Sequence, residues 1–338
     1  MRIGINGFGR IGRSVFRILN DRPGVAVVAI NDIADNDALG YLLEYDTVMG
    51  RFPDTVDVAD DVLRTSHQTV RMTAERDPAE LPWKELGVDA VIESTGRFRT
   101  RAEISRHLDA GAPRVLLTVP AKDEIDCTVV LGVNDDDLLP EHRIVSNASC
   151  TTNCLAPLAK VLHEAFVIER GMITTVHAYT NDQRLADVPH TDWRRSRAAA
   201  ENIIPTTTGA ARAVGKVLPE LAGKLDGMAM RVPIPDGSVV DLVAVLRDPA
   251  NAEQVNEAVR AASETPALKN ILLYSEDPIV SSDIVGEPHS SIFDAPYTKS
   301  LGGHFIKVLS WYDNEWGYSN RVVDLLERLA ALGPVSQS

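Results

Sequence analysis

The sequence predicts an α/β fold whose first half contains a doubly wound, mostly parallel sheet. Short apolar runs alternate with segments of helical periodicity, and glycines mark the first turn from strand to helix. Strands that alternate with helices form parallel sheets with helices on both faces. The chain has 338 residues, of which 44% are hydrophobic. It can therefore bury a large core, and its length favours two domains over one.

The first predicted strand, residues 2–6, is followed by a glycine-rich turn into a helix. Gly7, Gly9 and Gly12 form the pattern GxGxxG. One glycine permits the tight turn, one lets a pyrophosphate approach the backbone, and one allows close packing of helix on strand. The phosphates then contact the amides at the helix N-terminus. A turn with only a structural role is the alternative.

The second predicted strand, residues 25–31, leads directly to Asp32. This residue lies twenty positions beyond Gly12, where a carboxylate accepts hydrogen bonds from an adenosine ribose. Together with the glycine pattern, Asp32 predicts that the first domain binds a dinucleotide.

The alternation continues through further short apolar runs, at residues 88–95, 114–119, 127–133 and 143–147. Ligands of doubly wound sheets bind beyond the carboxyl ends of the strands. Thr95 and Thr118 lie at or near two such ends, so we expect them to line the cofactor site. The alternative is that they are ordinary hydroxyls at strand ends.

Two of the three cysteines lie in ASCTTNC, residues 148–154. This segment follows a predicted strand and precedes apolar residues at helical spacing, which places Cys150 in the first turn of a helix and Cys154 one turn deeper. The positive end of a helix dipole favours a thiolate, so we expect a lowered pKa for the Cys150 thiol. Cys154 is expected to be packed and inert.

Other roles fit the cysteines less well. With Cys127 they make an odd number, and the sequence shows neither a signal peptide nor an apolar run long enough to span a bilayer. We therefore expect a cytoplasmic protein with reduced thiols rather than a disulfide. A zinc site needs about four ligands, and no second cysteine or histidine cluster supplies them, so we expect no metal. The net charge of -14 argues against binding to nucleic acid and to anionic membranes.

A nucleophilic thiol needs a base, and His177 is the best placed of the eight histidines. It ends the β-branched run in MITTVHAYTND, where a side chain can be held rigidly at the edge of a sheet. His163 and His190 lie on a helix face and in a polar loop. For a histidine at a strand end, a structural role is the alternative.

Six segments stand out in order across almost the whole chain: INGFGRIGR, SNASCTTNC, TTVHAYTNDQ, NIIPTTTGAARAVGKVLPEL, GKLDGMAMRVP and SWYDNEWGYSNRVVDL. They resemble the signature segments of the phosphorylating glyceraldehyde-3-phosphate dehydrogenase family. The resemblance implies a Rossmann-type NAD-binding domain at residues 1–148 and an α+β catalytic domain with an antiparallel sheet at residues 149–312. It also implies a C-terminal helix within residues 313–338 that returns to the NAD-binding domain, and a homotetramer.

The resemblance also implies roles for single residues. Cys150 would attack the aldehyde of D-glyceraldehyde 3-phosphate while His177 takes its proton; a hydride would pass from the hemithioacetal to NAD, and inorganic phosphate would cleave the thioester to give 1,3-bisphosphoglycerate. Thr180 and Arg231 would hold the phosphate of the substrate. The attacking phosphate would be held by Ser149, Thr151, Arg195, Thr208 and Gly209.

For NAD, the resemblance adds residues to Gly7, Gly9, Gly12 and Thr95. These are Arg10 and Ile11 at the pyrophosphate, Asp32 at the adenosine ribose, Arg76 at the adenine, Thr118 near the nicotinamide ribose and Asn314 at the carboxamide. Asn314 alone comes from outside the NAD-binding domain that the resemblance implies.

Three hypotheses from different functional classes remain. The chain is a phosphorylating dehydrogenase, an erythrose-4-phosphate dehydrogenase that releases the acid by hydrolysis, or a non-catalytic binding protein that keeps the fold. The intact TTTG at residues 206–209 favours the first over the second, because the second class resembles the same scaffold but loses this phosphate-binding segment. The intact Cys150 and His177 disfavour the third.

Overall fold

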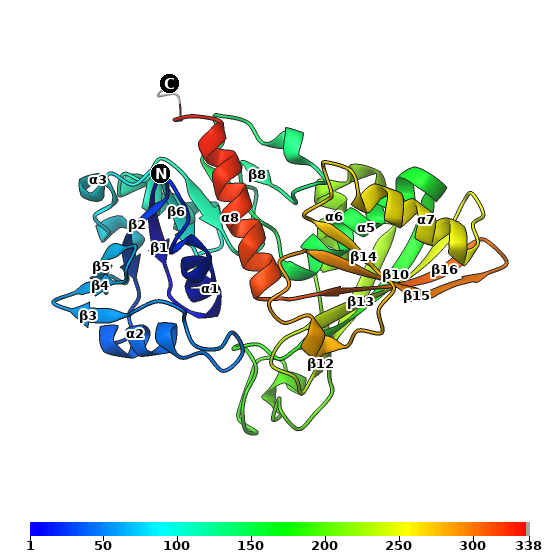
Figure 1. Ribbon diagram of the computed structural model, residues 1–338, viewed down its shortest axis with the longest axis horizontal. Coiled ribbons are helices and arrows are strands. Elements are labelled where there is room, and N and C mark those ends of the chain that lie inside the picture. The colour runs from blue at the N-terminus through cyan, green and yellow to red at the C-terminus, as the bar shows by residue number, and fades with distance from the viewer. Residues whose placement is uncertain (336–338) are drawn as a thin grey trace. The chain divides into compact units, whose positions relative to one another are not determined.

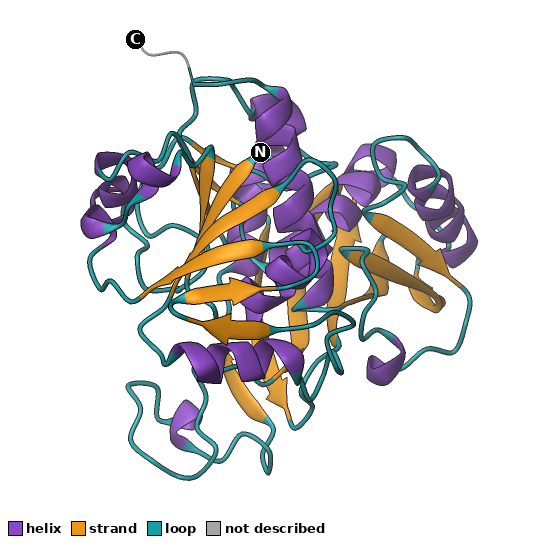
Figure 2. Ribbon diagram, turned by 60° about the vertical axis from the view of Figure 1, so that its left-hand side comes forward, coloured by secondary structure: helices purple, strands orange, loops and turns teal. Residues whose placement is uncertain are grey.

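A computed structural model describes residues 1–335, which form two compact units (Figure 1). The first unit comprises Met1–Val129, Asp135–Ala148 and the chain from Ser319 onward, and the second comprises Val130–Asn134 and Ser149–Tyr318. Each unit has a sheet of its own with helices packed against it (Figure 2). No described helix combines the length and the apolar character that are needed to cross a membrane.

Within the described residues, the first unit has a nine-stranded sheet of order β3-β4-β5-β2-β1-β6-β7-β9-β8. All neighbours from β5 to β8 are parallel, while β3, β4 and β5 pair antiparallel at one edge. The strands are β1 (Arg2–Asn6), β2 (Ala26–Asn31), β3 (Asp57–Ala59), β4 (Val62–Arg64), β5 (Thr69–Thr73), β6 (Ala90–Glu93), β7 (Val115–Leu117), β8 (Cys127–Thr128) and β9 (Ile144–Ser146).

The helices of the first unit alternate with its parallel strands, as the sequence predicts. They are α1 (Arg10–Leu19), α2 (Asn36–Glu44), α3 (Trp83–Leu86), α4 (Arg101–Asp109) and, from Ser319, most of α8 (Trp316–Ala331), with 3₁₀ turns η1 (Pro78–Glu80) and η2 (Asp135–Asp137). One predicted strand, residues 127–133, is shorter than expected. The chain leaves β8 at Thr128 and turns, with the Val133 amide donating to the Val130 carbonyl at 3.0 Å.

The second unit has a seven-stranded sheet among its described residues, of order β11-β12-β10-β13-β16-β15-β14. Four neighbouring pairs are antiparallel, and two, β10 with β12 and β14 with β15, are parallel. The strands are β10 (Ile168–Ala178), β11 (Ile204–Thr207), β12 (Leu225–Val232), β13 (Ser238–Leu246), β14 (Leu272–Ser275), β15 (Ser291–Leu301) and β16 (Phe305–Tyr312). The predicted fold class, with one mostly parallel and one mostly antiparallel sheet, is confirmed.

Three helices pack together on the second sheet: α5 (Cys150–Phe166), α6 (Ala210–Val217) and α7 (Ala252–Ser263) (Figure 1). Short 3₁₀ turns η3 (Arg194–Ser196), η4 (Pro219–Leu221) and η5 (Ser281–Asp283) lie in its loops. Helix α5 is buried along most of its length and contacts β10, β13, β15 and β16. Its N-terminus is therefore held firmly against the core of this unit.

Candidate active site

Cys150 is the first residue of α5, so the predicted position in the first helical turn is confirmed. In the turn before the helix, Ala148 has a φ of 54°, a left-handed conformation that is unfavourable for a residue with a Cβ and marks a sharp change of direction. Ser149 caps the helix, because its hydroxyl accepts the backbone N–H of Thr152 at 3.1 Å. Turn and cap together fix the thiol at the helix N-terminus.

His177 lies beside this thiol. Its Nε2 is 3.6 Å from the Cys150 sulfur, and the residue, at the end of β10, is only 4% exposed. The Nδ1 atom is 2.7 Å from the Ala178 carbonyl oxygen and 2.8 Å from Nη1 of Arg231. The structure thus brings the predicted nucleophile and base together and adds a cation on the far side of the ring.

The contacts of Nδ1 favour one tautomer of His177. Nη1 of Arg231 is also 2.9 Å from the Ala178 carbonyl and 3.3 Å from Oγ1 of Thr180, so its two hydrogens can serve these two oxygens. The Nδ1–H of His177 then donates to the second lone pair of the same carbonyl. This leaves Nε2 without a hydrogen and able to accept the proton of the Cys150 thiol.

The acidities correct one expectation from the sequence. Burial raises the pKa of the Cys150 thiol, and the charge of Arg231 and hydrogen bonds from Thr151 offset this only in part. Burial and then the charge of Arg231 lower the pKa of the His177 ring to about 3. Desolvation therefore outweighs the helix N-terminus, and both groups rest in their neutral forms.

The other two cysteines are poorer nucleophiles. Cys154 is fully buried, and burial raises the pKa of its thiol to about 12. Burial raises the pKa of the Cys127 thiol to about 11. Among the three free cysteines, Cys150 alone is partly exposed and has an imidazole in contact.

Tyr312 is a part of the site that the sequence analysis missed. Its hydroxyl lies 2.8 Å from the hydroxyls of both Thr151, on α5, and Thr175, on β10. Its ring meets the His177 ring edge to face, with centroids 5.8 Å apart. Tyr312 thereby braces the strand that carries the base and the helix that carries the thiol. It occurs in the segment SWYDNEWGYSN, but no spacing rule joins it to residues so far away in the chain.

Arg231 and Thr180 form the first candidate anion site. The strand register puts Arg231 of β12 directly beside His177 of β10, and its Nη1 reaches Thr180. The Nε atom of Arg231 is buried and makes no hydrogen bond to any described residue. A buried donor without an acceptor is costly, which makes this guanidinium a suitable place for an anionic oxygen.

Arg195 is the centre of a second polar cluster. Its Nε donates to Oγ1 of Thr206 at 2.9 Å, and that hydroxyl donates to Asp192 at 3.0 Å. Nη1 of Arg195 forms an ion pair with Asp182, whose other oxygen accepts the hydroxyl of Thr180. The Asp182 carboxylate therefore connects the two clusters. Asp182 was not identified from the sequence, and Thr206 was identified only as part of the TTTG segment.

The remaining predicted phosphate ligands lie at two helix N-termini. Thr208 and Gly209 precede α6, where the Thr208 hydroxyl accepts the Ala210 amide at 3.2 Å and a Cβ at Gly209 would meet nothing within 4 Å. Ser149 and Thr151 lie at the start of α5. Both of their hydroxyls have protein partners, so their backbone amides are the donors that suit an anion.

The first unit contains a pocket of about 290 Å³ that five predicted cofactor residues line: Gly7, Gly9, Asp32, Arg76 and Thr95. Six further residues that were not predicted from the sequence also line this pocket: Asn6, Asn31, Glu75, Ser94, Arg97 and Phe98. Arg10, Ile11 and Gly12 belong to the adjoining first turn of α1. Thr118 is buried, and its hydroxyl donates to the carbonyl of Glu93 at 3.2 Å. Asn314 belongs to the second unit, where its Oδ1 accepts the Ser238 hydroxyl at 2.5 Å.

The three glycines fit a bound pyrophosphate. Gly7 has a φ of +93°, and a Cβ there would lie 2.6 Å from the Thr95 nitrogen. At Gly12 a Cβ would lie 2.2 Å from the Gly7 carbonyl oxygen, whereas at Gly9 it would meet nothing within 4 Å. Turn, close packing and open approach are the three roles that glycines have in a dinucleotide-binding turn.

Asp32 completes this end of the pocket. Its Oδ2 accepts the Phe8 amide at 2.7 Å and its Oδ1 accepts the Ala34 amide at 3.0 Å. Each carboxylate oxygen has a second lone pair, which suits it to ribose hydroxyls.

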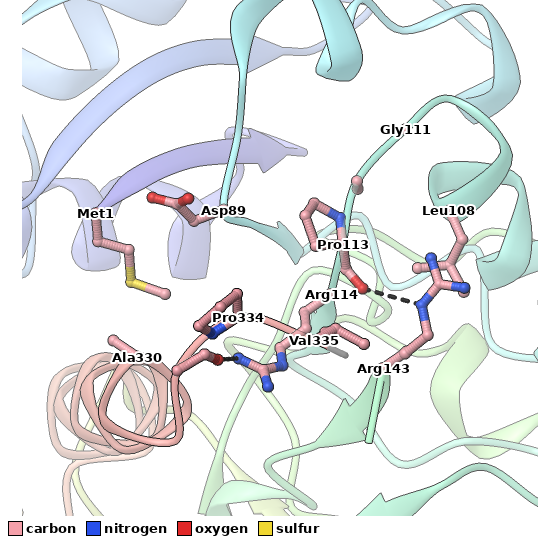
Figure 3. Close-up of a pocket in the computed structure, with 12 residues that line it drawn as sticks. Met1, Asp89, Leu108, Gly111, Pro113, Arg114, Arg143, Ala330, Pro334 and Val335 are labelled. Carbon is pink, nitrogen blue, oxygen red and sulfur yellow. Dashed lines mark hydrogen bonds between the residues drawn. The ribbon is translucent and has the colours of Figure 1, made fainter. Parts of the chain in front are cut away.

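A larger cavity, of about 900 Å³, lies elsewhere in the first unit, between Met1, Arg114, Arg143 and the end of α8 (Figure 3). Arg114 donates to the carbonyls of Leu329 and Gly333, and Arg143 donates to that of Pro113 at 3.1 Å. Its two arginines thus serve backbone carbonyls, and none of the predicted site residues lines it. The predicted cofactor residues line the smaller pocket instead.

Comparison with known proteins agrees with this arrangement. Residues 1–101 match the NAD binding domain, and residues 149–314 the C-terminal domain, of glyceraldehyde 3-phosphate dehydrogenase. The chain is 58% identical to glyceraldehyde-3-phosphate dehydrogenase of Borreliella burgdorferi over 97% of this chain and 99% of the relative. It is 57% identical to that of Geobacillus stearothermophilus over 98% and 99%, and 55% identical to glyceraldehyde-3-phosphate dehydrogenase 1 of Bacillus subtilis over the same shares. The chain therefore belongs to the glyceraldehyde-3-phosphate dehydrogenase family.

Proposed function

We propose that this protein oxidises D-glyceraldehyde 3-phosphate to 1,3-bisphosphoglycerate with NAD and inorganic phosphate. The observation that carries the proposal is the 3.6 Å contact of the Cys150 sulfur with Nε2 of His177, beside the cation of Arg231. A thiol, a base and a fixed cation are the groups that thioester chemistry on a phosphorylated aldehyde requires.

In the first step, the Cys150 sulfur attacks the aldehyde carbon and its proton moves to Nε2 of His177. The carbonyl oxygen becomes an oxyanion, for which the backbone amide of Cys150 and the protonated His177 ring are the donors. His177 returns the proton to this oxygen to give the hemithioacetal and takes it back as the hydride leaves. NAD, when bound, supplies the acceptor for that hydride. A thioester remains on Cys150.

In the second step, inorganic phosphate attacks the thioester carbon and the Cys150 thiolate leaves, to be protonated again by His177. We assign the substrate phosphate to Thr180 and Arg231, since the unbonded Nε of Arg231 offers a buried donor. We assign the attacking phosphate to a second set of donors. That set comprises Arg195, Thr208, Gly209 and the start of α5 at Ser149 and Thr151.

For the cofactor, we propose that the pocket at Asp32, Arg76 and Thr95 holds the adenosine half of NAD, with the pyrophosphate on the first turn of α1 at Arg10 and Ile11. Thr118 and Asn314 are assigned to the nicotinamide half. We further propose residues 1–148 as the NAD-binding domain, residues 149–312 as the catalytic domain and residues 313–338 as a segment whose helix returns to the first. Family membership supports a cytoplasmic homotetramer, and light scattering should give four times the mass of the chain.

The test is NADH formation with and without phosphate. Without phosphate, rapid mixing with aldehyde and NAD should give a burst of at most one NADH per chain and then stop, because the thioester persists. With phosphate, turnover should be steady, and His177→Asn should slow the burst by about 10²- to 10⁴-fold. A full steady rate without phosphate or arsenate would overturn the proposal in favour of the hydrolytic erythrose-4-phosphate dehydrogenase.

A further inference from the structure

A chain of fully buried polar groups lies next to the cofactor pocket of the first unit. Glu93, at the end of β6, and His107, on α4, are both 0% exposed, as is Trp83. The indole Nε1 of Trp83 donates to Nδ1 of His107 at 3.0 Å, and Nε2 of His107 is 3.0 Å from Oε2 of Glu93. A carboxylate buried in this way costs several kcal/mol unless hydrogen bonds surround it.

The residues at the two ends of this series of buried polar groups fix which atom donates and which accepts in every hydrogen bond. An indole N–H can only donate, so Nδ1 of His107 accepts, and the single hydrogen of the neutral ring is on Nε2 and points at Glu93. On the other side, Nδ2 of Asn6 donates to the same Oε2 at 2.5 Å. Oδ1 of Asn6 accepts Nδ2 of Asn31 at 2.7 Å, so the Asn6 amide cannot be turned round without losing both bonds.

The second oxygen of Glu93 serves the pocket wall directly. Its Oε1 accepts the backbone N–H of Thr95 at 2.8 Å and also the Thr95 hydroxyl. Thr95, Asn6 and Asn31 all line the pocket. Asn31 in turn makes two hydrogen bonds to the backbone of Glu75. Its Oδ1 accepts the Glu75 amide at 2.8 Å, and its Nδ2 donates to the Glu75 carbonyl at 2.9 Å.

We propose that Glu93 is a positioning residue for NAD: its carboxylate accepts hydrogen bonds from Asn6, His107 and Thr95 and thereby shapes the pocket wall before the cofactor arrives. The proposal rests on the proposed function, because it takes NAD as the ligand of this pocket. Glu93 does not itself line the pocket, so it acts only through the side chains that do.

Glu93→Gln is the decisive variant. Glutamine keeps the size of the side chain but replaces one acceptor oxygen by an NH₂ donor. That donor must face either the pair Asn6 and His107 or the Thr95 amide, and both sides already donate. The Kd of NAD for the cofactor-free protein, measured by calorimetric titration, should rise about ten- to a hundredfold, as expected for an unsatisfied buried pair. The kcat at saturating NAD should change less than about threefold, because no reacting atom moves.

Val91→Ala is the matched control. Val91 is fully buried on the same strand β6 and packs in the hydrophobic cluster that contains Trp83, but its side chain makes no hydrogen bond to the polar groups. The variant should lose stability by creating a cavity, yet its Kd for NAD should stay within about threefold of that of the wild type. An equal loss of NAD affinity in Val91→Ala and Glu93→Gln would overturn the proposal, as would unchanged affinity in Glu93→Gln.

Amide hydrogen exchange on the wild type tests the same idea without a variant. The Thr95 amide should be protected from exchange in the cofactor-free protein. Addition of NAD should slow its exchange further by at most about threefold. Exchange of that amide at the rate of an open loop until NAD is added would overturn the proposal. A wild type that exchanges as expected but shows no phosphate-dependent turnover would overturn the proposed function and leave the positioning role of Glu93 standing.

Discussion

Replacing Asp236 by asparagine should change how the free energy of unfolding depends on pH. Asp236 is 2% exposed and Asp313 is 1% exposed. Oδ1 of Asp236 accepts the Gly237 amide at 2.8 Å, and the buried Asp236 side chain is hydrogen-bonded to that of Asp313. Burial and then the negative charge of Asp313 raise the pKa of Asp236 to about 9. At neutral pH the folded pair therefore holds one proton.

The expected magnitude follows from proton counting. An unfolded aspartate has a pKa of about 3.9, so between about pH 4 and pH 9 the folded protein holds one proton more than the unfolded chain. The retained proton contributes to the free energy of unfolding. This contribution is fully present below pH 4 and is lost, by about 1.4 kcal/mol per pH unit, as the pH rises through the folded pKa. The count belongs to the pair, so it does not depend on which carboxyl carries the proton.

Asp236→Asn removes this proton. Burial still raises the pKa of the remaining Asp313 carboxyl, but the backbone amides that it accepts lower that pKa and favour its ionised form: Gly286 at 2.8 Å, Glu315 at 2.8 Å and Trp316 at 2.6 Å. A pH of 7 lies about three pH units above the pKa of an unfolded aspartate. At this pH the variant should therefore be more stable than the wild type by up to about 4 kcal/mol.

Urea unfolding of the cofactor-free protein at a fixed concentration, between pH 5.5 and pH 8.5, measures the effect. The difference in free energy of unfolding, variant minus wild type, should grow by about 1.4 kcal/mol per pH unit. Asp277→Asn, at an exposed loop position, should give no such slope. Parallel curves for wild type and Asp236→Asn would refute the reasoning.

Three further predictions concern the proposed site. Iodoacetamide below one equivalent should label Cys150 before the buried Cys154, and peptide mapping that finds the label on Cys154 would contradict this. The value of kcat/KM should be higher with NAD than with NADP, because Asp32 repels a 2′-phosphate; an equal or larger value with NADP would show that other residues set the preference. Arg195→Leu should raise the KM of phosphate more than that of the aldehyde, and Arg231→Leu the reverse. Loss of one charge-assisted hydrogen bond costs about 1.5 to 3 kcal/mol, so each rise should be about ten- to a hundredfold in steady-state kinetics, and equal effects on both reactants would refute two separate anion sites.

What the sequence predicts correctly depends on residues close together in the chain. The GxGxxG turn places Gly7, Gly9 and Asp32 around one pocket, because a strand, a tight turn and a helix impose their geometry within about thirty residues. Cys150 begins its helix for the same reason, since Ser149 is a capping residue followed by helical periodicity. The strands β3, β4 and β5 were missed, because they follow one another with no helix between them and so lack the alternation of strand and helix that marks the parallel strands.

What the sequence does not predict depends on contacts between distant residues. Tyr312 bonds Thr151 from 161 positions away, and only the pairing of β10, β13 and β16 brings it there. The acidity of Cys150 was misjudged for a related reason. A helix N-terminus can be read from local pattern, whereas desolvation depends on everything packed around the sulfur.

The glycines of the first turn separate folding from binding within a single motif. A methyl group at Gly12 would clash with the Gly7 carbonyl oxygen, and one at Gly7 would clash with the backbone of Thr95. A methyl group at Gly9 would meet no atom within 4 Å. Alanine at the first two positions should therefore damage the unit itself. Alanine at Gly9 should give a folded chain, so that any loss of NAD binding in this variant would report on the space beside Gly9 and not on the stability of the unit.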